Sequence, residues 1–236
     1  MPRRFLAVVS ISVLPLLGMG QSIFSDFDNF LKANVVFGLV DYEFLSNNQG
    51  KLEGISESIA SYELSNSTTE EQTAFYINAY NFLVINQIAR NYPIKSPLEV
   101  DGFFKENTFL VAGETLTLDE IEFTKLLGKA KDPKIHFALG CGARGCPFLY
   151  DEAFFPERIN EQLDFRARQI IEISNYVFMD EDKQVVIMSK IFDWYTDQFL
   201  AESESLIEFV NQYRSRQIPS NYRVQFREYD WSLNDR

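Results

Sequence analysis

Apolar residues recur at helical spacing through the first half of the chain. One helical face runs from Phe24 to Leu31, and the same spacing returns from Leu52 to Tyr62. A third apolar face follows Thr68, a residue type that caps helix starts, and continues to Ile88 ahead of Pro93. We therefore predict three helices in this half, of which the third is the longest.

The pattern shortens to strand length in the middle of the chain. Alternating segments at residues 108–112 and 114–118 predict a β-hairpin. Asp119 and Glu122 have the spacing of a capping pair, which predicts a short helix to Leu127. The compact apolar run Ile135–Leu139 has the length and composition of a buried strand.

Helices and strands are interleaved in the remainder of the chain. We predict a helix over 156–171, a hairpin over 176–188, helices in SKIFDWYTDQFL and over 204–213, and a closing strand over 222–231. Helices first, followed by interleaved hairpins and helices, predict the α+β class. The expected architecture is a mainly antiparallel sheet packed by several helices.

The N-terminus has the three parts of an export signal. Arg3 and Arg4 are basic, Phe5–Leu17 is apolar but short for a bilayer, and Gly18-Met19-Gly20 forms a small-residue cleavage site. We predict that residues 1–20 are a cleaved signal peptide and that residues 21–236 form a single α+β domain. The mature protein would be periplasmic or secreted, without stable membrane insertion. An uncleaved membrane anchor is the alternative.

Net charge narrows the classes of partner. The chain carries a formal charge of −12, and removing the two signal-peptide arginines, with no acidic residue among residues 1–20, makes it −14. Such a surface repels phosphate backbones and anionic headgroups, so we expect no nucleic-acid partner. No pattern in the sequence predicts a cofactor or a resident metal.

The segment Lys134–Pro147, KIHFALGCGARGCP, carries the chemistry-bearing residues. It contains His136, the only histidine of the chain, and both cysteines, Cys141 and Cys146. A neutral imidazole can take a thiol proton, which creates a nucleophile for acyl transfer or amide hydrolysis. If Ile135–Gly140 is a strand, His136 and Cys141 point to opposite faces, so their meeting needs a sharp turn at Gly140.

Three other arrangements of the cysteines stay open. An exported chain with two cysteines can form a structural disulfide between Cys141 and Cys146, which would remove both nucleophiles. His136 and the two cysteines could bind zinc with one carboxylate, although their spacing matches no usual zinc pattern. The cysteines could also be buried and inert.

Residues around this segment could complete a catalytic site. Arg144 and the amides of the glycine-containing loop could hold an oxyanion, or Arg144 could be a solvated loop residue. Asn78 and Asn81 share a helix face and could orient His136 or tie the helix to a loop. The pairs Phe103-Phe104, Phe154-Phe155 and Trp194-Tyr195 could line a cleft, although core packing is the more common role.

Several motifs in a fixed order carry a family resemblance. FYINAYNFLVINQI, NYPIKS followed by GFF, LTLDEIE, DPKIHFALGCGARGCPFL and SKIFDWYTDQF resemble the domain-of-unknown-function family 547 over about Thr73 to Phe199. The usual loop of that family reads C-G-A-x-S-C-P, whereas this chain has Gly145 where serine is common. Plant members keep the first cysteine but vary the histidine and the second cysteine, which favours Cys141 for any shared role.

The resemblance implies an architecture compatible with a rearranged papain-like or transglutaminase-like fold, which is an analogy and carries no activity by itself. Two functional hypotheses follow. The first is a thiol-dependent hydrolase or acyltransferase on peptide-like or envelope substrates, with Cys141 or Cys146 as nucleophile and His136 as base. The second is a non-catalytic ligand- or protein-binding domain with a structural Cys141–Cys146 disulfide.

Overall fold

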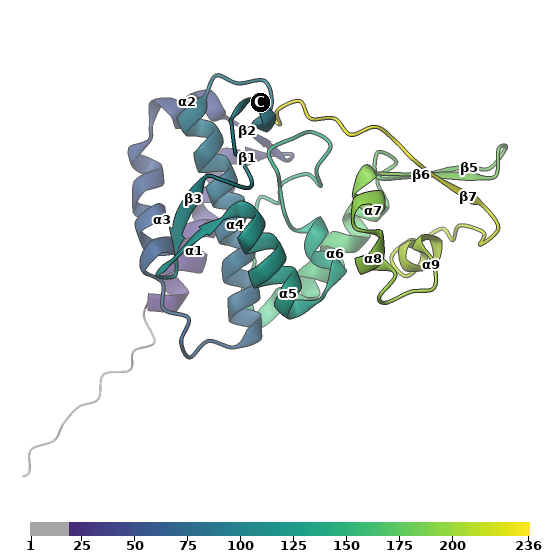
Figure 1. The fold of residues 1–236 in the computed structure, drawn as a ribbon, viewed down its shortest axis with the longest axis horizontal. Coiled ribbons are helices and arrows are strands. Elements are labelled where there is room, and N and C mark those ends of the chain that lie inside the picture. Colours follow the sequence, from purple (N-terminus) through teal and green to yellow (C-terminus); the bar gives the residue numbers. More distant parts are fainter. Residues whose placement is uncertain (1–18) are drawn as a thin grey trace, which may run out of the picture.

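The computed structural model describes residues 19–236, which Figure 1 draws as a ribbon. Most of the predicted signal peptide, residues 1–18, lies outside the described residues, and Met19 and Gly20 open the first helix. The N-terminal half contains α1 (Met19–Asn34), β1 (Val35–Val36), β2 (Leu39–Val40), α2 (Tyr42–Asn47), α3 (Gly50–Ser61), α4 (Thr69–Asn91), β3 (Thr108–Val111), β4 (Glu114–Thr117) and α5 (Leu127–Ala130). The C-terminal half contains α6 (Ile159–Ile171), β5 (Val177–Asp180), β6 (Val185–Met188), α7 (Lys190–Trp194), α8 (Thr196–Phe199), α9 (Leu206–Asn211) and β7 (Arg223–Phe226).

Helix α4 is the centre of the N-terminal group of elements (Figure 1). Every residue from Thr73 to Ala89 is buried, because α1, α2, α3 and α6 all contact this helix. The side chain of Thr68 accepts a hydrogen bond from the Glu71 backbone N–H at 3.2 Å, which confirms the predicted N-cap. A helix buried on all sides must satisfy its polar side chains internally, and this requirement governs the asparagines described below.

The predicted hairpins are confirmed. Strands β3 and β4 pair antiparallel, with Thr108 opposite Thr117, and β5 pairs antiparallel with β6, with Val177 opposite Met188. Strand β7 then joins β6 in parallel, and β1 and β2 form a short hairpin that the sequence pattern did not predict. The α+β class with small, mainly antiparallel sheets and packed helices is therefore correct. The single-domain extent and the papain-like comparison stay predictions.

Three local predictions are wrong. Asp119 and Glu122 do not form a capping pair, since the Asp119 side chain makes no capping hydrogen bond and the Glu122 carboxyl bonds the hydroxyl groups of Tyr195 and Tyr80. The predicted strand Ile135–Leu139 begins instead within a 3-10 helix at Pro133–Phe137, because the Asp132 side chain accepts from the Lys134 N–H at 2.9 Å and Pro133 fits the first helical position. Strand parity therefore does not govern where the His136 side chain points. The predicted closing strand over 222–231 is also too long, since β7 ends at Phe226.

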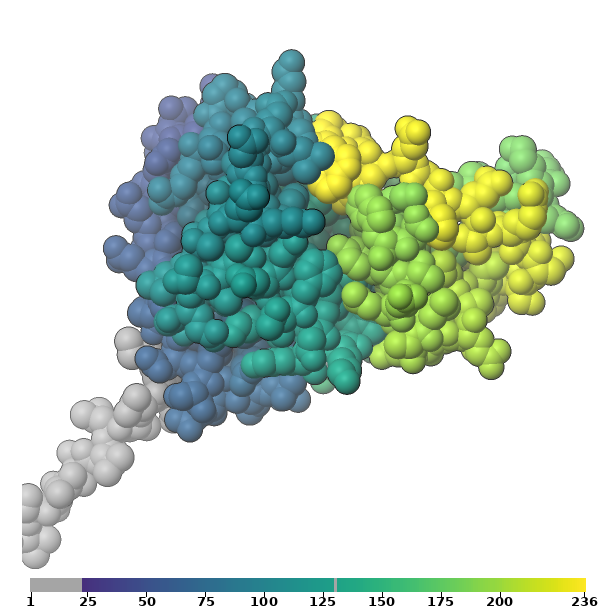
Figure 2. Space-filling view, viewed as in Figure 1, coloured from purple at the N-terminus to yellow at the C-terminus, as the bar shows by residue number. Residues whose placement is uncertain are grey.

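The residues after β7 form an extended segment, Arg227–Arg236, that we call the C-terminal strap. In Figure 2 it is the yellow band that crosses from the C-terminal sheet to the N-terminal elements. Its main chain bonds to β2, where the Val40 N–H donates to the Asn234 carbonyl at 3.0 Å and the Arg236 N–H donates to the Val40 carbonyl at 3.1 Å. The strap therefore ties the two groups of elements together.

A buried arginine ties α6 to the segment that carries His136 and the cysteines. Arg166 on α6 is 1% exposed, and its guanidinium donates to the carbonyls of Phe137 and Phe148 and to the Gln169 side chain. The Phe148 ring lies over the guanidinium at 4.4 Å from its centroid. Burial lowers the pKa of Arg166 to about 10, so the group stays charged at neutral pH. None of the helices within residues 19–236 has both the length and the apolar content that crossing a membrane requires.

Replacing Arg166 by methionine should lower the free energy of unfolding by about 3 kcal/mol, because the buried Phe137 and Phe148 carbonyls lose their donor. Urea denaturation followed by circular dichroism measures the change. The matched control is Arg168→Met on the exposed face of the same helix, for which little change is expected. Equal effects of the two substitutions would contradict the role given to Arg166.

Candidate functional site

A cavity of about 320 Å³ lies where α4, α7 and the C-terminal strap approach one another. We call it the aromatic cavity, because half of the residues that line it carry aromatic or imidazole rings. It is lined by Tyr80, Phe104, Lys105, Asp119, Glu122, Phe123, His136, Leu139, Cys141, Cys146, Pro147, Ile191, Trp194, Tyr195, Tyr229 and Trp231. The predicted histidine and both predicted cysteines are therefore brought to one cavity.

Glu122 is the most perturbed acid of the cavity. It lies on a π-helical turn, Glu120–Leu126, that follows β4, and it is 7% exposed. Burial raises the pKa of its carboxyl to about 7, although hydrogen bonds with the hydroxyl groups of Tyr195 and Tyr80 oppose the rise. The carboxyl thus exchanges its proton near neutral pH.

His136 faces Glu122 from the 3-10 turn. Its Nδ1 lies 3.7 Å from Glu122 Oε1, its Nε2 lies 2.7 Å from Gln198 Oε1, and its ring stacks on Tyr195 with centroids 3.8 Å apart. Burial lowers the pKa of His136 to about 4, so the imidazole is neutral at neutral pH. Because Gln198 Oε1 accepts, Nε2 carries the proton. His136 Nδ1 and Glu122 Oε1, 3.7 Å apart, therefore do not form an ion pair at neutral pH.

The two cysteines form a disulfide, one of the alternatives that the sequence left open. Cys141 is half-buried and Cys146 is buried. The Cys141 N–H donates to Cys146 Sγ at 2.9 Å, and the Tyr229 hydroxyl donates to the same sulfur at 3.0 Å. In this state neither sulfur is a nucleophile or a zinc ligand.

Asn81 and Asn78 bind main chain. Asn81 donates to the Ala138 carbonyl at 2.9 Å and accepts from the Gly140 N–H at 2.8 Å, which fixes the chain between His136 and the cysteines. Asn78 binds both main-chain polar groups of Phe154 in the same way. Both asparagine side chains thus tie α4 to neighbouring loops. Among the described residues, the hydrogen-bond partner of the His136 ring is Gln198.

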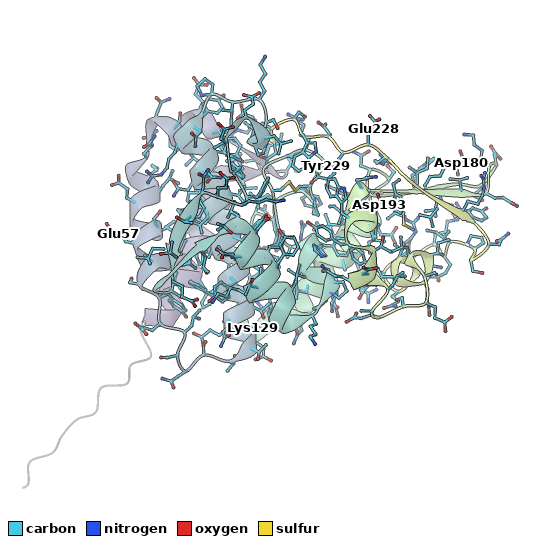
Figure 3. All side chains as sticks on the ribbon, in the orientation of Figure 1. Glu57, Lys129, Asp180, Asp193, Glu228 and Tyr229 are labelled. Carbon is cyan, nitrogen blue, oxygen red and sulfur yellow. A yellow bond between two sulfur atoms is a disulfide. The ribbon has the colours of Figure 1, made fainter. Side chains whose placement is uncertain are left out.

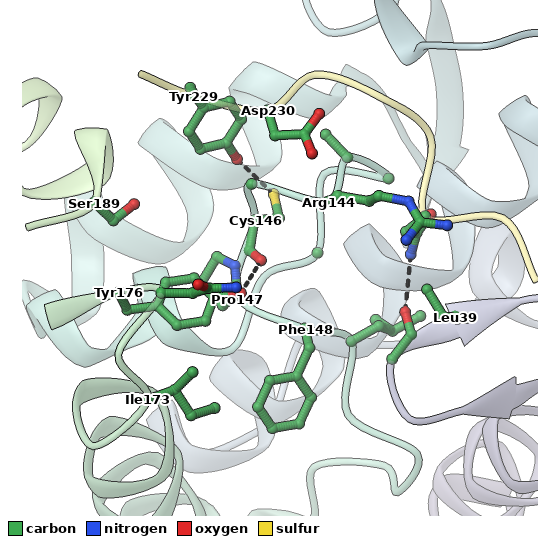
Figure 4. A pocket seen from close by; sticks show the side chains of 18 of the residues that line it. Leu39, Arg144, Cys146, Pro147, Phe148, Ile173, Tyr176, Ser189, Tyr229 and Asp230 are labelled. Carbon is green, nitrogen blue, oxygen red and sulfur yellow. Dashed lines mark hydrogen bonds between the residues drawn. The ribbon is translucent and has the colours of Figure 1, made fainter. Parts of the chain in front are cut away.

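Arg144 faces the C-terminal strap. Its guanidinium donates to the carbonyls of Leu233 and Asp235, each at 3.1 Å. It lines a second cavity of about 580 Å³, shown in Figure 4, on the other side of the loop Cys141–Cys146, which we call the cysteine loop. Cys146, Pro147 and Tyr229 line both cavities.

The strap passes so close to the cysteine loop that Gly145 has no room for a side chain. The Gly145 N–H donates to the Asp230 carbonyl at 2.8 Å, and a Cβ atom at Gly145 would lie 2.9 Å from the main-chain N and O of Asp230. This close approach is a physical reason for a glycine at position 145.

Sequence reasoning missed several residues of the cavity. Glu122 looked like a capping residue, and no local pattern pointed to Gln198 or Tyr229. Among the aromatic pairs that the sequence suggested as cleft residues, Phe104, Trp194 and Tyr195 line the cavity, whereas Phe154 lies in the core. In Figure 3, Tyr229 on the strap lies between the N-terminal helices and α7.

Comparison with known proteins places part of this site in a family segment. Residues 64–171 match the model of a family described as "Protein of unknown function, DUF547". The match includes α4 and the cysteine loop and ends before the SKIFDWYTDQF motif. No curated protein and no solved structure matches the chain.

The pH dependence of stability should reveal the Glu122–His136 pair. The Glu122 pKa rises from 4.5 to about 7 on folding, so its contribution to the free energy of unfolding falls as pH rises through that window. The His136 pKa falls from 6.5 to about 4, so its contribution rises over pH 4 to 6.5. The two slopes oppose each other in the wild-type protein.

Glu122→Gln should remove the falling slope, so its stability relative to wild type should rise by about 3 kcal/mol between pH 4.5 and 7. His136→Asn should lose a similar amount relative to wild type between pH 4 and 6.5. Urea denaturation across this pH range measures both. Parallel profiles for the wild type and the two variants would show that neither group is perturbed.

Proposed function

The chain belongs to the DUF547 family, whose description names no activity, and we propose that its aromatic cavity binds the cationic group of a peptide-like ligand. The observation that carries the proposal is a buried carboxyl without a cationic partner. In the described part of the chain, the only basic group within ion-pair distance of Glu122 is His136, and His136 is neutral at neutral pH. A ligand ammonium or guanidinium would supply the missing charge.

The other acid of the cavity, Asp119, already has a basic side chain near it. Burial raises the pKa of Asp119, and the positive charge of Lys105 opposes that rise. Lys105 is exposed, whereas Glu122 is buried. The carboxyl that gains most from an incoming cation is therefore the buried one.

The aromatic wall suits the same ligand chemistry. The ring centroid of Trp194 lies 4.8 Å from that of Tyr229 and 6.0 Å from that of Trp231. The Tyr195 hydroxyl forms a hydrogen bond with the Glu122 carboxyl. Ring faces attract cations, and they attract them more strongly where water is excluded. Trp194 is 46% exposed, so a ring of this wall is accessible from solvent. The net charge of −12 also favours a cationic ligand.

In this proposal the disulfide braces the wall of the cavity, and the protein acts after export as a binding domain. An oxidising compartment preserves such a bond. The predicted signal peptide at residues 1–20 supports this location.

Ligand binding can be followed without a label, because both tryptophans of the chain, Trp194 and Trp231, line the cavity. We expect N-acetyl-lysine amide to change tryptophan fluorescence saturably and to bind more tightly than N-acetyl-norleucine amide. Its affinity should rise as pH passes through about 7, because Glu122 then loses its proton. Glu122→Gln should weaken binding about tenfold or more.

The matched control is Glu63→Gln, which makes the same charge change at an exposed position outside the cavity and should leave affinity unchanged. Equal binding of the lysine and norleucine derivatives would instead identify a purely apolar pocket. Retained lysine affinity in Glu122→Gln would refute the role of the carboxyl.

A second candidate function is supported by the meeting of His136, Cys141 and Cys146 in one cavity. It is a thiol-dependent hydrolase or acyltransferase on peptide-like or envelope substrates, active only after reduction of the disulfide. His136 would be the base, and Asn81 would act by fixing the chain after His136. With a pKa of about 4, the imidazole is a weak base, which is why we place this function second.

In the reduced native protein, this candidate requires a thiol whose alkylation by iodoacetamide reports a depressed pKa and slows in His136→Asn. Quantifying the modified peptides by mass spectrometry assigns the reaction to Cys141 or Cys146. If both thiols are inert, or if His136→Asn reacts like the wild type, the candidate should be abandoned.

A further inference from the structure

We propose that the Cys141–Cys146 disulfide is a thiol–disulfide exchange site, which reacts with a thiol small enough to enter the aromatic cavity. This activity goes beyond ligand binding and does not depend on the cationic ligand proposed above. It rests on the unequal surroundings of the two sulfurs.

The two cysteines differ in accessibility. Both line the aromatic cavity, but Cys141 is half-buried whereas Cys146 is 7% exposed. An incoming thiolate therefore meets Cys141 Sγ first. Exchange requires attack on one sulfur and departure of the other, so Cys146 is the leaving group.

The surroundings of Cys146 favour the thiolate that departs. Its sulfur accepts hydrogen bonds from the Cys141 N–H at 2.9 Å and from the Tyr229 hydroxyl at 3.0 Å. The same hydroxyl lies 3.2 Å from Cys141 Sγ, so the donor that distinguishes Cys146 from Cys141 is the main-chain N–H. Burial raises the pKa of Tyr229, so this hydroxyl keeps its proton and remains a donor. Donors aimed at a sulfur lower the pKa of its thiol, and a thiol of lower pKa leaves faster. Figure 4 shows Tyr229 reaching Cys146 from the C-terminal strap.

The cysteine loop is held independently of the disulfide. The Asn234 N–H donates to the Gly142 carbonyl at 2.9 Å, the Gly145 N–H donates to the Asp230 carbonyl at 2.8 Å, and the Tyr176 hydroxyl donates to the Cys146 carbonyl. These bonds do not involve sulfur. After reduction they keep Cys141 and Cys146 close together, so the disulfide can form again.

The exchange balances in two steps. A thiolate of a dithiol attacks Cys141 Sγ, the sulfur–sulfur bond breaks, and its electron pair passes to Cys146 Sγ. In the resulting mixed disulfide, the first sulfur of the dithiol is bonded to Cys141 Sγ. The second thiolate of the dithiol attacks that first sulfur and releases the Cys141 thiolate. The dithiol is oxidised to a disulfide, both cysteines are reduced, and two electrons are transferred. A second disulfide compound reoxidises the pair by the reverse steps.

The test uses the oxidised full chain and dithiothreitol as the probe. Samples are quenched with iodoacetamide over time, and the mass increase of the native protein gives the rate of reduction. We expect native reduction without unfolding, and a rate about tenfold lower in Tyr229→Phe, which keeps the ring but loses the hydrogen bond to the leaving sulfur. Tyr222→Phe changes a tyrosine that lines neither cavity and should react like the wild type.

A second measurement covers the case in which Tyr229→Phe disturbs packing. In Cys141→Ser the donor N–H is retained, and the alkylation rate of Cys146 against pH should give a thiol pKa below the ordinary value of about 8.5. Circular dichroism and tryptophan emission confirm that each variant is folded. A disulfide that dithiothreitol reduces only in urea, or a Cys146 pKa at or above the ordinary value, would overturn the proposal.

Ligand binding by the oxidised protein is measured without any thiol. Failure of the exchange reaction therefore leaves the binding proposal intact, and the reverse also holds.

Discussion

The main-chain hydrogen bonds between the cysteine loop and the C-terminal strap are the constraint on which the site depends. Arg144 and Gly145 donate to the Ser232 and Asp230 carbonyls at 2.8 Å each, and the same strap continues along β2. Because these bonds join main chain to main chain, they set the path of the strap with little help from side-chain identity. The strap then delivers Tyr229 to the sulfurs and Trp231 to the cavity wall. Without it, one wall of the aromatic cavity would be missing.

The polar interior follows from how fully α4 is buried. A helix covered on all sides can keep polar residues only if their side chains form hydrogen bonds. Asn81 does so with the Ala138 carbonyl and the Gly140 N–H. These two hydrogen bonds fix the main chain between His136 and the cysteine loop. Glu122 shows the opposite case, because its buried charge is only partly compensated by tyrosine hydroxyls. Such incomplete compensation costs stability, and it is common where a protein binds or transforms a ligand.

The sequence pattern correctly predicted the elements that depend on interactions between residues close together in the chain. The long helix α4 and both longer hairpins follow from apolar spacing, a threonine cap and turn residues, all of which are near neighbours in sequence. The strand expected at Ile135–Leu139 was wrong because Asp132 and Pro133 impose a turn that outweighs apolar content. His136 and the cysteines stood out by residue type alone. No local pattern identifies Glu122, Gln198 or Tyr229 as site residues, because their roles depend on contacts between distant parts of the chain. Tyr229, for example, contacts Cys146 across a sequence separation of 83.

The aromatic cavity is divided between two parts of the chain. Its polar floor, with Tyr80, Glu122, His136 and the disulfide, lies within the family-matched residues 64–171. Its walls of Trp194, Tyr195, Tyr229 and Trp231 lie beyond them. Chains that share the matched segment can therefore inherit the same acid, imidazole and sulfur groups and still present differently shaped pockets. Chemistry and selectivity are then free to diverge separately, so a ligand identified for one member would not transfer to another unless its C-terminal walls were also compared.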